Sequence, residues 1–159
     1  HVNTLCRHCK WKCAQCSFKI DWSTSYPVPT SQRTYQCIVM WNPPAGDVAA
    51  KLSPSVPQVV IGNAFSLTAA DVDAVVSHPR SHVWITRCAA VTDAALQKLA
   101  ATSGASLVYL NVCFCRSVTD VGAQAVLDAC TNLKFFDVHL TKATQRMEDK
   151  IRAKGIECA

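Results

Sequence analysis

The chain has 159 residues, of which 50% are hydrophobic and 17% charged, and its formal net charge is +5. This length and composition suit one folded domain and exclude a disordered tail. Asp, Lys or Arg recurs throughout the apolar regions, so no stretch reaches the roughly 18 uninterrupted apolar residues of a transmembrane helix. The chain begins at His1 without a Met, which a removed leader or a partial sequence would both explain.

Four closely spaced cysteines mark the first segment, residues 1–22. They follow the pattern Cys6-x-x-Cys9-x-x-x-Cys13-x-x-Cys16, which contains two Cys-x-x-Cys pairs. Two such pairs can supply the four thiolates of a tetrahedral zinc site, so zinc is the expected cofactor. Two nested disulfides, Cys6–Cys16 and Cys9–Cys13, are the alternative in an oxidising compartment, and free thiols are a third.

Basic and aromatic residues alternate around these cysteines. They are Arg7, Lys10, Trp11, Lys12, Phe18, Lys19 and Trp22. Such a patch can bind phosphates and stack bases, which would indicate an RNA partner. The same aromatic residues could instead form the small core of a metal-bound head, or the patch could dock on an acidic protein. We favour the small core over the RNA-binding interpretation.

Residues 23–57 contain most of the prolines. Six of the seven lie between residues 27 and 57. Because proline fixes φ and lacks a backbone N–H, this segment is predicted to be an extended arm. Residues 34–41 are the exception, since their β-branched and aromatic side chains favour a strand or a packed segment. We place a domain boundary near Pro57.

Residues 58–159 contain an internal repeat. The sequence Leu-Val-Tyr-Leu-Asn-Val at residues 107–112 recurs 26 residues later as Leu-Lys-Phe-Phe-Asp-Val. The sequence Cys-Ala-Ala-Val-Thr-Asp at residues 88–93 recurs 27 residues later as Cys-Arg-Ser-Val-Thr-Asp. A fainter copy begins at Val59. Four units of this length predict a solenoid.

Each unit predicts a short strand followed by a helix. Alternating apolar residues such as Val83 and Ile85 indicate the strands. Helices are expected over residues 69–77, 93–101 and 120–129, with N-caps at Thr68, Thr92 and Thr119. Asp93 and Asp120 add negative charge to the first helical turn. A charged closing helix follows, with Ala143, Met147 and Ile151 on its inner face.

The repeat at residues 107–133 resembles the cysteine-containing leucine-rich repeat. It reads Leu-x-x-Leu-x-Val-x-x-Cys-x-x-Val-Thr-Asp-x-Gly, followed by Ala-Cys-Thr-Asn-Leu. The resemblance implies an α/β leucine-rich-repeat solenoid with a parallel inner sheet and outer helices over residues 58–159, preceded by the extended cysteine-rich arm. This repeat type occurs in F-box receptors and other adaptors, so it indicates a fold and not one function.

Residues 58–159 are also similar in order and length to the family of mitochondrial coupling factor B, the ATP synthase s subunit, and of the distal membrane arm assembly factor of complex I. The similarity includes the Cys113-x-Cys115 motif, the Leu-Lys-Phe-Phe strand and the charged closing helix. It implies a non-catalytic accessory subunit of ATP synthase or respiratory complex I, on the matrix side of the inner membrane or peripheral to it. It also permits redox-active thiols at Cys113 and Cys115. These two cysteines alternate with Phe114 on a predicted strand, so both are expected to point to the same side, as buried core cysteines would also do.

We find no residues in the sequence that form a recognisable active site, so we do not expect an enzyme. There is no Gly-rich phosphate loop, no Ser/His/Asp order and no His-Glu-x-x-His motif. The expected partners are protein subunits of a large mitochondrial assembly. A mitoribosome-associated or other RNA-contacting protein is the alternative. An F-box-type adaptor needs an F-box helix pair, which the Pro-rich first third does not offer.

Overall fold

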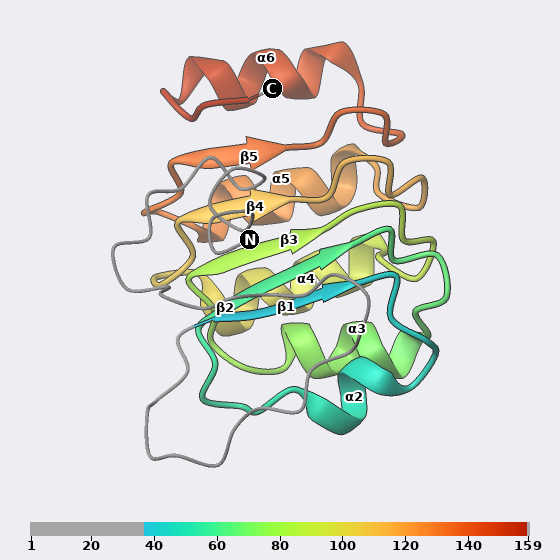
Figure 1. Cartoon of the computed structure of the whole chain (residues 1–159). Helices are drawn as coiled ribbons and strands as arrows, with labels where there is room; N and C mark the ends of the chain where they lie inside the picture. The colour runs from blue at the N-terminus through green and yellow to red at the C-terminus, as the bar shows by residue number, and fades with distance from the viewer. Residues whose placement is uncertain (1–36, 159) are drawn as a thin grey trace, which may run out of the picture.

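The computed structural model describes residues 37–158, which form one parallel sheet flanked by helices (Figure 1). The predicted cysteine-rich head and the first part of the predicted arm lie outside these residues. The strands of the sheet are β1 (Cys37–Trp41), β2 (Gln58–Gly62), β3 (His82–Ile85), β4 (Tyr109–Asn111) and β5 (Phe135–Asp137). They are all parallel, and their order in the sheet is their order in the chain.

A helix follows each strand. The helices are α2 (Asp47–Lys51), α3 (Ala69–Val76), α4 (Asp93–Ser103), α5 (Asp120–Ala129) and α6 (Gln145–Ala153). The helices from α2 to α5 stack in order on one face of the sheet, and α6 lies beyond β5 at the end of the stack (Figure 1). The described part of the chain is therefore a repeat-like α/β fold, compatible with an α/β solenoid. None of its helices is long and apolar enough to cross a bilayer.

The core lies between the sheet and the helices and runs through every unit. Alternate strand residues point into it, because successive side chains of a strand point to opposite faces. One row in register comprises Ile38, Val59, Val83, Leu110 and Phe136. The last four of these are at most 1% exposed, and the helices contribute Val72, Leu96, Leu99 and Val126 to the same cluster. No unit could bury these side chains alone, so the stack is the stable structure.

The predicted helix starts are confirmed. The side chains of Thr68, Thr92 and Thr119 accept hydrogen bonds from the backbone N–H groups of the helices that follow them. In α6, Met147 and Ile151 are buried as the spacing predicts, and Ala143 packs against the core from the turn before the helix. Local signals therefore fix where these helices begin and which side faces inward.

The Thr-Asp pairs also join neighbouring units. The Asp93 carboxylate at the start of α4 accepts from Thr119 N at 2.8 Å and from Thr119 Oγ1 at 2.6 Å. Asp120 at the start of α5 accepts in the same way from Thr144 N and Oγ1, both at 2.7 Å. These hydrogen bonds lower the pKa of Asp120. Each aspartate thus supports the start of the next helix as well as its own.

The first unit is held by a buried carboxylate, Asp71, in α3. Its oxygens accept from the backbone N–H groups of Gly46 and Ala49 at 2.8 and 3.0 Å, and from Thr68 N and Oγ1 at 3.0 and 2.7 Å. Burial by itself raises the pKa of Asp71, but these donors outweigh it and lower the pKa to about 2. Asp71 therefore ties α2 to α3 in its ionised form.

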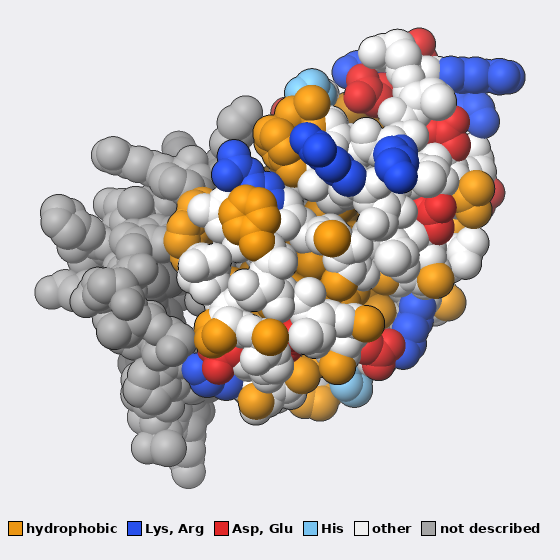
Figure 2. Space-filling model, turned by 90° about the vertical axis from the view of Figure 1, so that its right-hand side faces the viewer, with side chains coloured by type: hydrophobic (Ala, Val, Ile, Leu, Met, Phe, Trp, Pro, Cys, Tyr) orange, Lys and Arg blue, Asp and Glu red, His pale blue; other side chains and the backbone are white. Residues whose placement is uncertain are grey.

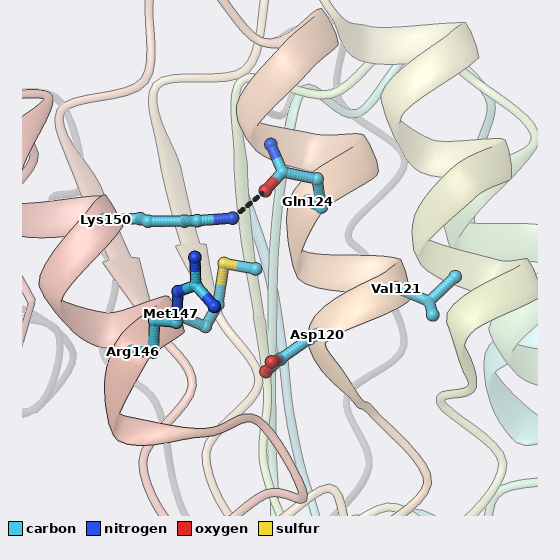
Figure 3. Close-up of a pocket in the computed structure, with 6 residues that line it drawn as sticks. All are labelled: Asp120, Val121, Gln124, Arg146, Met147 and Lys150. Atoms are coloured by element: carbon cyan, nitrogen blue, oxygen red, sulfur yellow. Dashed lines mark hydrogen bonds between the residues drawn. The ribbon is translucent and has the colours of Figure 1, made fainter.

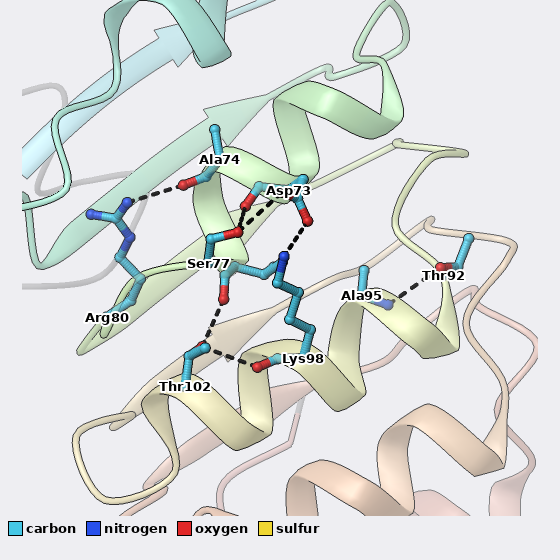
Figure 4. A network of polar contacts seen from close by, with 9 residues as sticks. Asp73, Ala74, Ser77, Arg80, Thr92, Ala95, Lys98 and Thr102 are labelled. Carbon is cyan, nitrogen blue, oxygen red and sulfur yellow. Dashed lines mark hydrogen bonds and ion pairs between the residues drawn. The ribbon is translucent and has the colours of Figure 1, made fainter.

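Arg80 is a second buried charge, and carbonyl oxygens surround it. At the C-terminal end of α3, its guanidinium donates to Ala74 O at 3.2 Å (Figure 4). It donates to Val75 O at 3.0 Å as well. It also donates to the carbonyls of Ser53, Pro54 and Val56, in the segment that leads into β2. The negative end of the α3 dipole favours a cation at this position. Arg80 thus joins the segment before β2 to the end of α3.

A further polar contact joins α3 to α4. Thr102 Oγ1 in α4 donates to Val76 O at 2.6 Å, and Lys98 Nζ lies 2.5 Å from Asp73 Oδ1 on the exposed side of the two helices (Figure 4). The surface ion pair contributes little to stability because water screens it.

The sheet begins before Pro57, where the sequence placed the end of an extended arm. β1 pairs with β2 over its full length, with Ile38 opposite Val59 and Met40 opposite Ile61. The prolines do not prevent this pairing, because those within the described residues before Pro57 lie in the turns on either side of α2. Residues 37–57 are therefore part of the same folded unit as the repeats.

Candidate functional site

The predicted zinc ligands Cys6, Cys9, Cys13 and Cys16 lie outside the described residues, as does the basic and aromatic run that suggested RNA binding. Within residues 37–158, no group of three or more His, Cys, Asp or Glu side chains could hold a metal ion. Zinc binding by the head stays a prediction.

Cys113 and Cys115 lie in the turn after β4 and not on a strand. β4 ends at Asn111, and Phe114 has a φ of 61°, so the alternation expected of a strand is broken. Cys115 is fully buried and its Sγ donates to Ile85 O at 3.4 Å, whereas Cys113 is partly exposed. Burial raises the pKa of Cys113 to about 11 and that of Cys115 to about 12. Both environments favour the unreactive thiol over the thiolate.

We expect iodoacetamide to alkylate Cys113 about a hundredfold more slowly at neutral pH in the folded protein than in the unfolded chain, because its pKa is raised from the usual 9.0 to about 11. Timed alkylation followed by peptide mass spectrometry would measure the rate. The same reaction in denaturant is the control. Equal rates in the two states would show a reactive thiol and favour the redox role.

The turns after the five strands share a left-handed backbone position. The residues that occupy it are Asn42, Asn63, Arg87, Phe114 and Leu140, with φ between 49° and 61°. Non-glycine residues rarely adopt this conformation, and bulky ones least of all. The recurrence shows that one turn geometry is built into every unit.

Exposed apolar side chains gather on this turn side of the molecule. Phe65 is 64% exposed, Leu140 49% and Trp41 45%. Figure 2 views the molecule from the side on which the strands end, and hydrophobic and basic side chains are mixed there. We call the set Phe65, Arg87, Phe114, Arg116, Leu140 and Lys142 the turn patch. Its members come from the four turns that follow β2 to β5.

Arg87 lies at the centre of the turn patch between two aromatic rings. Its Cζ is 5.1 Å from the centroid of the Phe114 ring and 5.9 Å from that of Phe65. Its Nη1 also donates to Asn63 Oδ1 at 3.3 Å. Cation–π contacts of this kind hold an arginine in place while leaving the edges of the guanidinium available to further acceptors.

The turn patch carries charge of one sign. The four turns, residues 62–68, 86–92, 112–119 and 138–144, contain no Asp or Glu, whereas Arg87, Arg116 and Lys142 are exposed there. None of these three cations takes part in the ion pairs found among residues 37–158. The aspartates that adjoin these turns, Asp93, Asp120 and Asp137, already accept hydrogen bonds from other described residues.

The strand face opposite the helices carries an aromatic row. His82, Tyr109 and Phe135 are in register on neighbouring strands, with ring centroids 6.2 Å apart in the first pair and 4.4 Å in the second. Beside them, Asn111 Nδ2 donates to Asp137 Oδ2 at 3.0 Å. Burial lowers the pKa of His82, so it is neutral at neutral pH. Stacking of this row stabilises the sheet.

A groove of about 390 Å³ lies between α5 and α6. Arg146, Met147 and Lys150 of α6 face α5 across it, and Lys150 Nζ donates to Gln124 Oε1 at 3.0 Å (Figure 3). Asp120 also lines the groove, but its carboxylate accepts from Thr144. The groove is therefore lined by two cations, Arg146 and Lys150, beside the buried Met147.

Comparison of the chain with protein-family models and with curated proteins finds no match.

Proposed function

We propose that this protein is a non-catalytic accessory subunit of a large mitochondrial assembly, ATP synthase or respiratory complex I, and that it binds neighbouring protein subunits through the turn patch. The observation that carries the proposal is that the exposed Phe65 and Leu140 and the half-buried Phe114 lie on one side of the molecule, in the turns after the strands. Single exposed apolar residues are common, but a contiguous exposed patch is typical of an interaction surface. Phe65 and Leu140 are the most exposed apolar residues of the turn patch.

The repeat-like fold supports the leucine-rich-repeat part of this proposal. Cys88 and Cys115 occupy equivalent places in the turns of neighbouring units, and both are fully buried. A small buried cysteine at this place agrees with the cysteine-containing type of repeat that the sequence resembles. The short parallel strands and stacked helices of the described residues agree with the same fold class.

The test compares two variants of the tagged full chain in mitochondria. On native gels, the unchanged protein is expected to migrate with ATP synthase or complex I, and the double variant Phe65→Ser, Leu140→Ser is expected to lose most of this association. Val121→Ser is the matched control, because Val121 is 59% exposed but lies on α5. Migration as a free monomer, or equal retention of both variants, would contradict the proposal.

A further inference from the structure

We infer that the turn patch binds an acidic segment of a partner protein that also carries apolar side chains, an inference that rests on the function proposed above. The patch contains two kinds of exposed group. Phe65 and Leu140 lie in its first and last turns, and Arg87, Arg116 and Lys142 supply its charge. A complementary partner must therefore bring both carboxylates and apolar side chains to the same surface.

The charge of the patch is not neutralised within the described residues. Its four turns carry three exposed cations and no acidic residue. Elsewhere in this part of the chain, Lys51, Lys98 and Arg152 form ion pairs, whereas the exposed Lys134, Arg146, Lys150 and Lys154 do not. Lys51 lies 2.8 Å from Asp47, and Arg152 lies 3.4 Å from Glu148. What distinguishes the patch is that its cations share one surface whose four turns contain no carboxylate.

Arg87 is held in a position suited to a carboxylate. Its Cζ lies 5.9 Å from the centroid of the Phe65 ring and 5.1 Å from that of Phe114, and its Nη1 donates to Asn63 Oδ1. The edge formed by Nε and Nη2 is the one that faces a further acceptor. A guanidinium edge matches the two oxygens of a carboxylate and can form two parallel hydrogen bonds with it. Because the side chain is already ordered, binding costs less rotamer entropy.

The dimensions of the patch suit a short extended segment. Neighbouring parallel strands lie about 4.8 Å apart, so four adjacent turns cover about 15 Å. An extended chain of about five residues spans this length at roughly 3.3 Å per residue. Alternating acidic and apolar side chains in such a segment could reach the cations and the apolar ends of the patch together.

The arrangement favours a protein segment over a membrane surface. Basic and aromatic residues together also occur on surfaces that bind anionic lipids. However, the ring of Phe65 packs against the guanidinium of Arg87. Insertion of that ring into a bilayer would carry the charge toward the hydrocarbon region, where it is costly.

The experiment uses the full chain and a probe peptide of alternating glutamate and leucine, with a peptide of alternating glutamine and leucine as control. NMR titration is expected to shift the amide resonances of the turn patch with the glutamate peptide only. Replacing Arg87, Arg116 and Lys142 together by glutamine is expected to weaken binding about tenfold. The charge-matched control replaces Lys98, Arg146 and Lys150 by glutamine and is expected to bind normally. Unchanged patch resonances, or equal binding of the two triple variants, would overturn the inference.

Two further measurements separate the alternatives. The first measurement is binding to vesicles of phosphatidylcholine with phosphatidylserine. If the unchanged protein binds the vesicles but not the peptide, and the first triple variant does not bind the vesicles, the patch belongs to a membrane surface and the inference is overturned. The second measurement is migration on native gels. If the Phe65→Ser, Leu140→Ser variant loses its association with the complex and the Arg87, Arg116 and Lys142 triple variant keeps it, the proposed function stands and only the acidic partner is excluded. Loss of this association in both variants supports the inference.

Discussion

Replacing Arg80 by methionine is expected to lower the free energy of unfolding by about 3 kcal/mol. Methionine fills much of the same volume but donates no hydrogen bond. The carbonyls of Ala74 and Val75, and those of the segment before β2, would lose a charged donor. Removal of the buried charge recovers part of this loss, because Arg80 is fully buried and its pKa is lowered by desolvation. Urea denaturation followed by circular dichroism would measure the change.

Arg116→Met is the matched control for Arg80. Arg116 is exposed and has no ion pair among residues 37–158, so its replacement is expected to change stability by no more than about 0.5 kcal/mol. In Arg80→Lys the charge is kept, but the lysine cannot reach all the carbonyls, so the loss of unfolding free energy should be intermediate. Equal stability of Arg80→Met and Arg116→Met would show that the carbonyls find other partners.

Asp71 is expected to make the free energy of unfolding depend on pH in the acid range. Its folded pKa of about 2 lies below the usual 3.8, so its ionised form stabilises the folded state above about pH 4. This contribution, about 2 kcal/mol, is lost as the pH falls through 3.8 toward 2. Asp71→Asn is expected to lose a similar amount at neutral pH, because an amide offers only one acceptor oxygen to the four donors. Chemical denaturation at several pH values would measure both effects.

The neighbouring Asp73 supplies the control for this prediction. Asp73 is exposed and its carboxylate faces Lys98 and Ser77 on the surface of α3. Asp73→Asn should leave the neutral-pH stability nearly unchanged and keep the acid-dependent loss that Asp71 causes. An Asp71→Asn protein that loses stability in acid as steeply as the unchanged protein would contradict the assignment to Asp71.

The sequence predicted the parts of the fold that depend on local patterns. Thr68, Thr92 and Thr119 were identified as N-caps because a hydroxyl before a helical period is a local signal. The strands were identified from apolar alternation, and the parallel α/β arrangement followed from the repeat. The caps and the strand alternation need only neighbouring residues, and the arrangement of the units follows because the same local pattern recurs along the chain.

The features that sequence reasoning missed depend on distant contacts. Nothing in the sequence marks Arg80 as buried, because its carbonyl partners lie up to 27 residues away. The turn geometry gave no signal, since Arg87, Phe114 and Leu140 hold a backbone position that usually favours glycine. Cys113 and Cys115 were placed on one side of a strand because the turn at Phe114 was not foreseen. The turn patch itself is made only when four turns stack.

At two left-handed positions of the turn patch, the side chain that contributes to the binding surface also lowers the stability of its turn. Phe114 and Leu140 hold a backbone conformation that costs roughly 1 kcal/mol relative to glycine. Glycine at either position would relieve that cost and would also delete a side chain that the surface presents. At these two positions the more stable turn and the complete binding surface therefore require different residues.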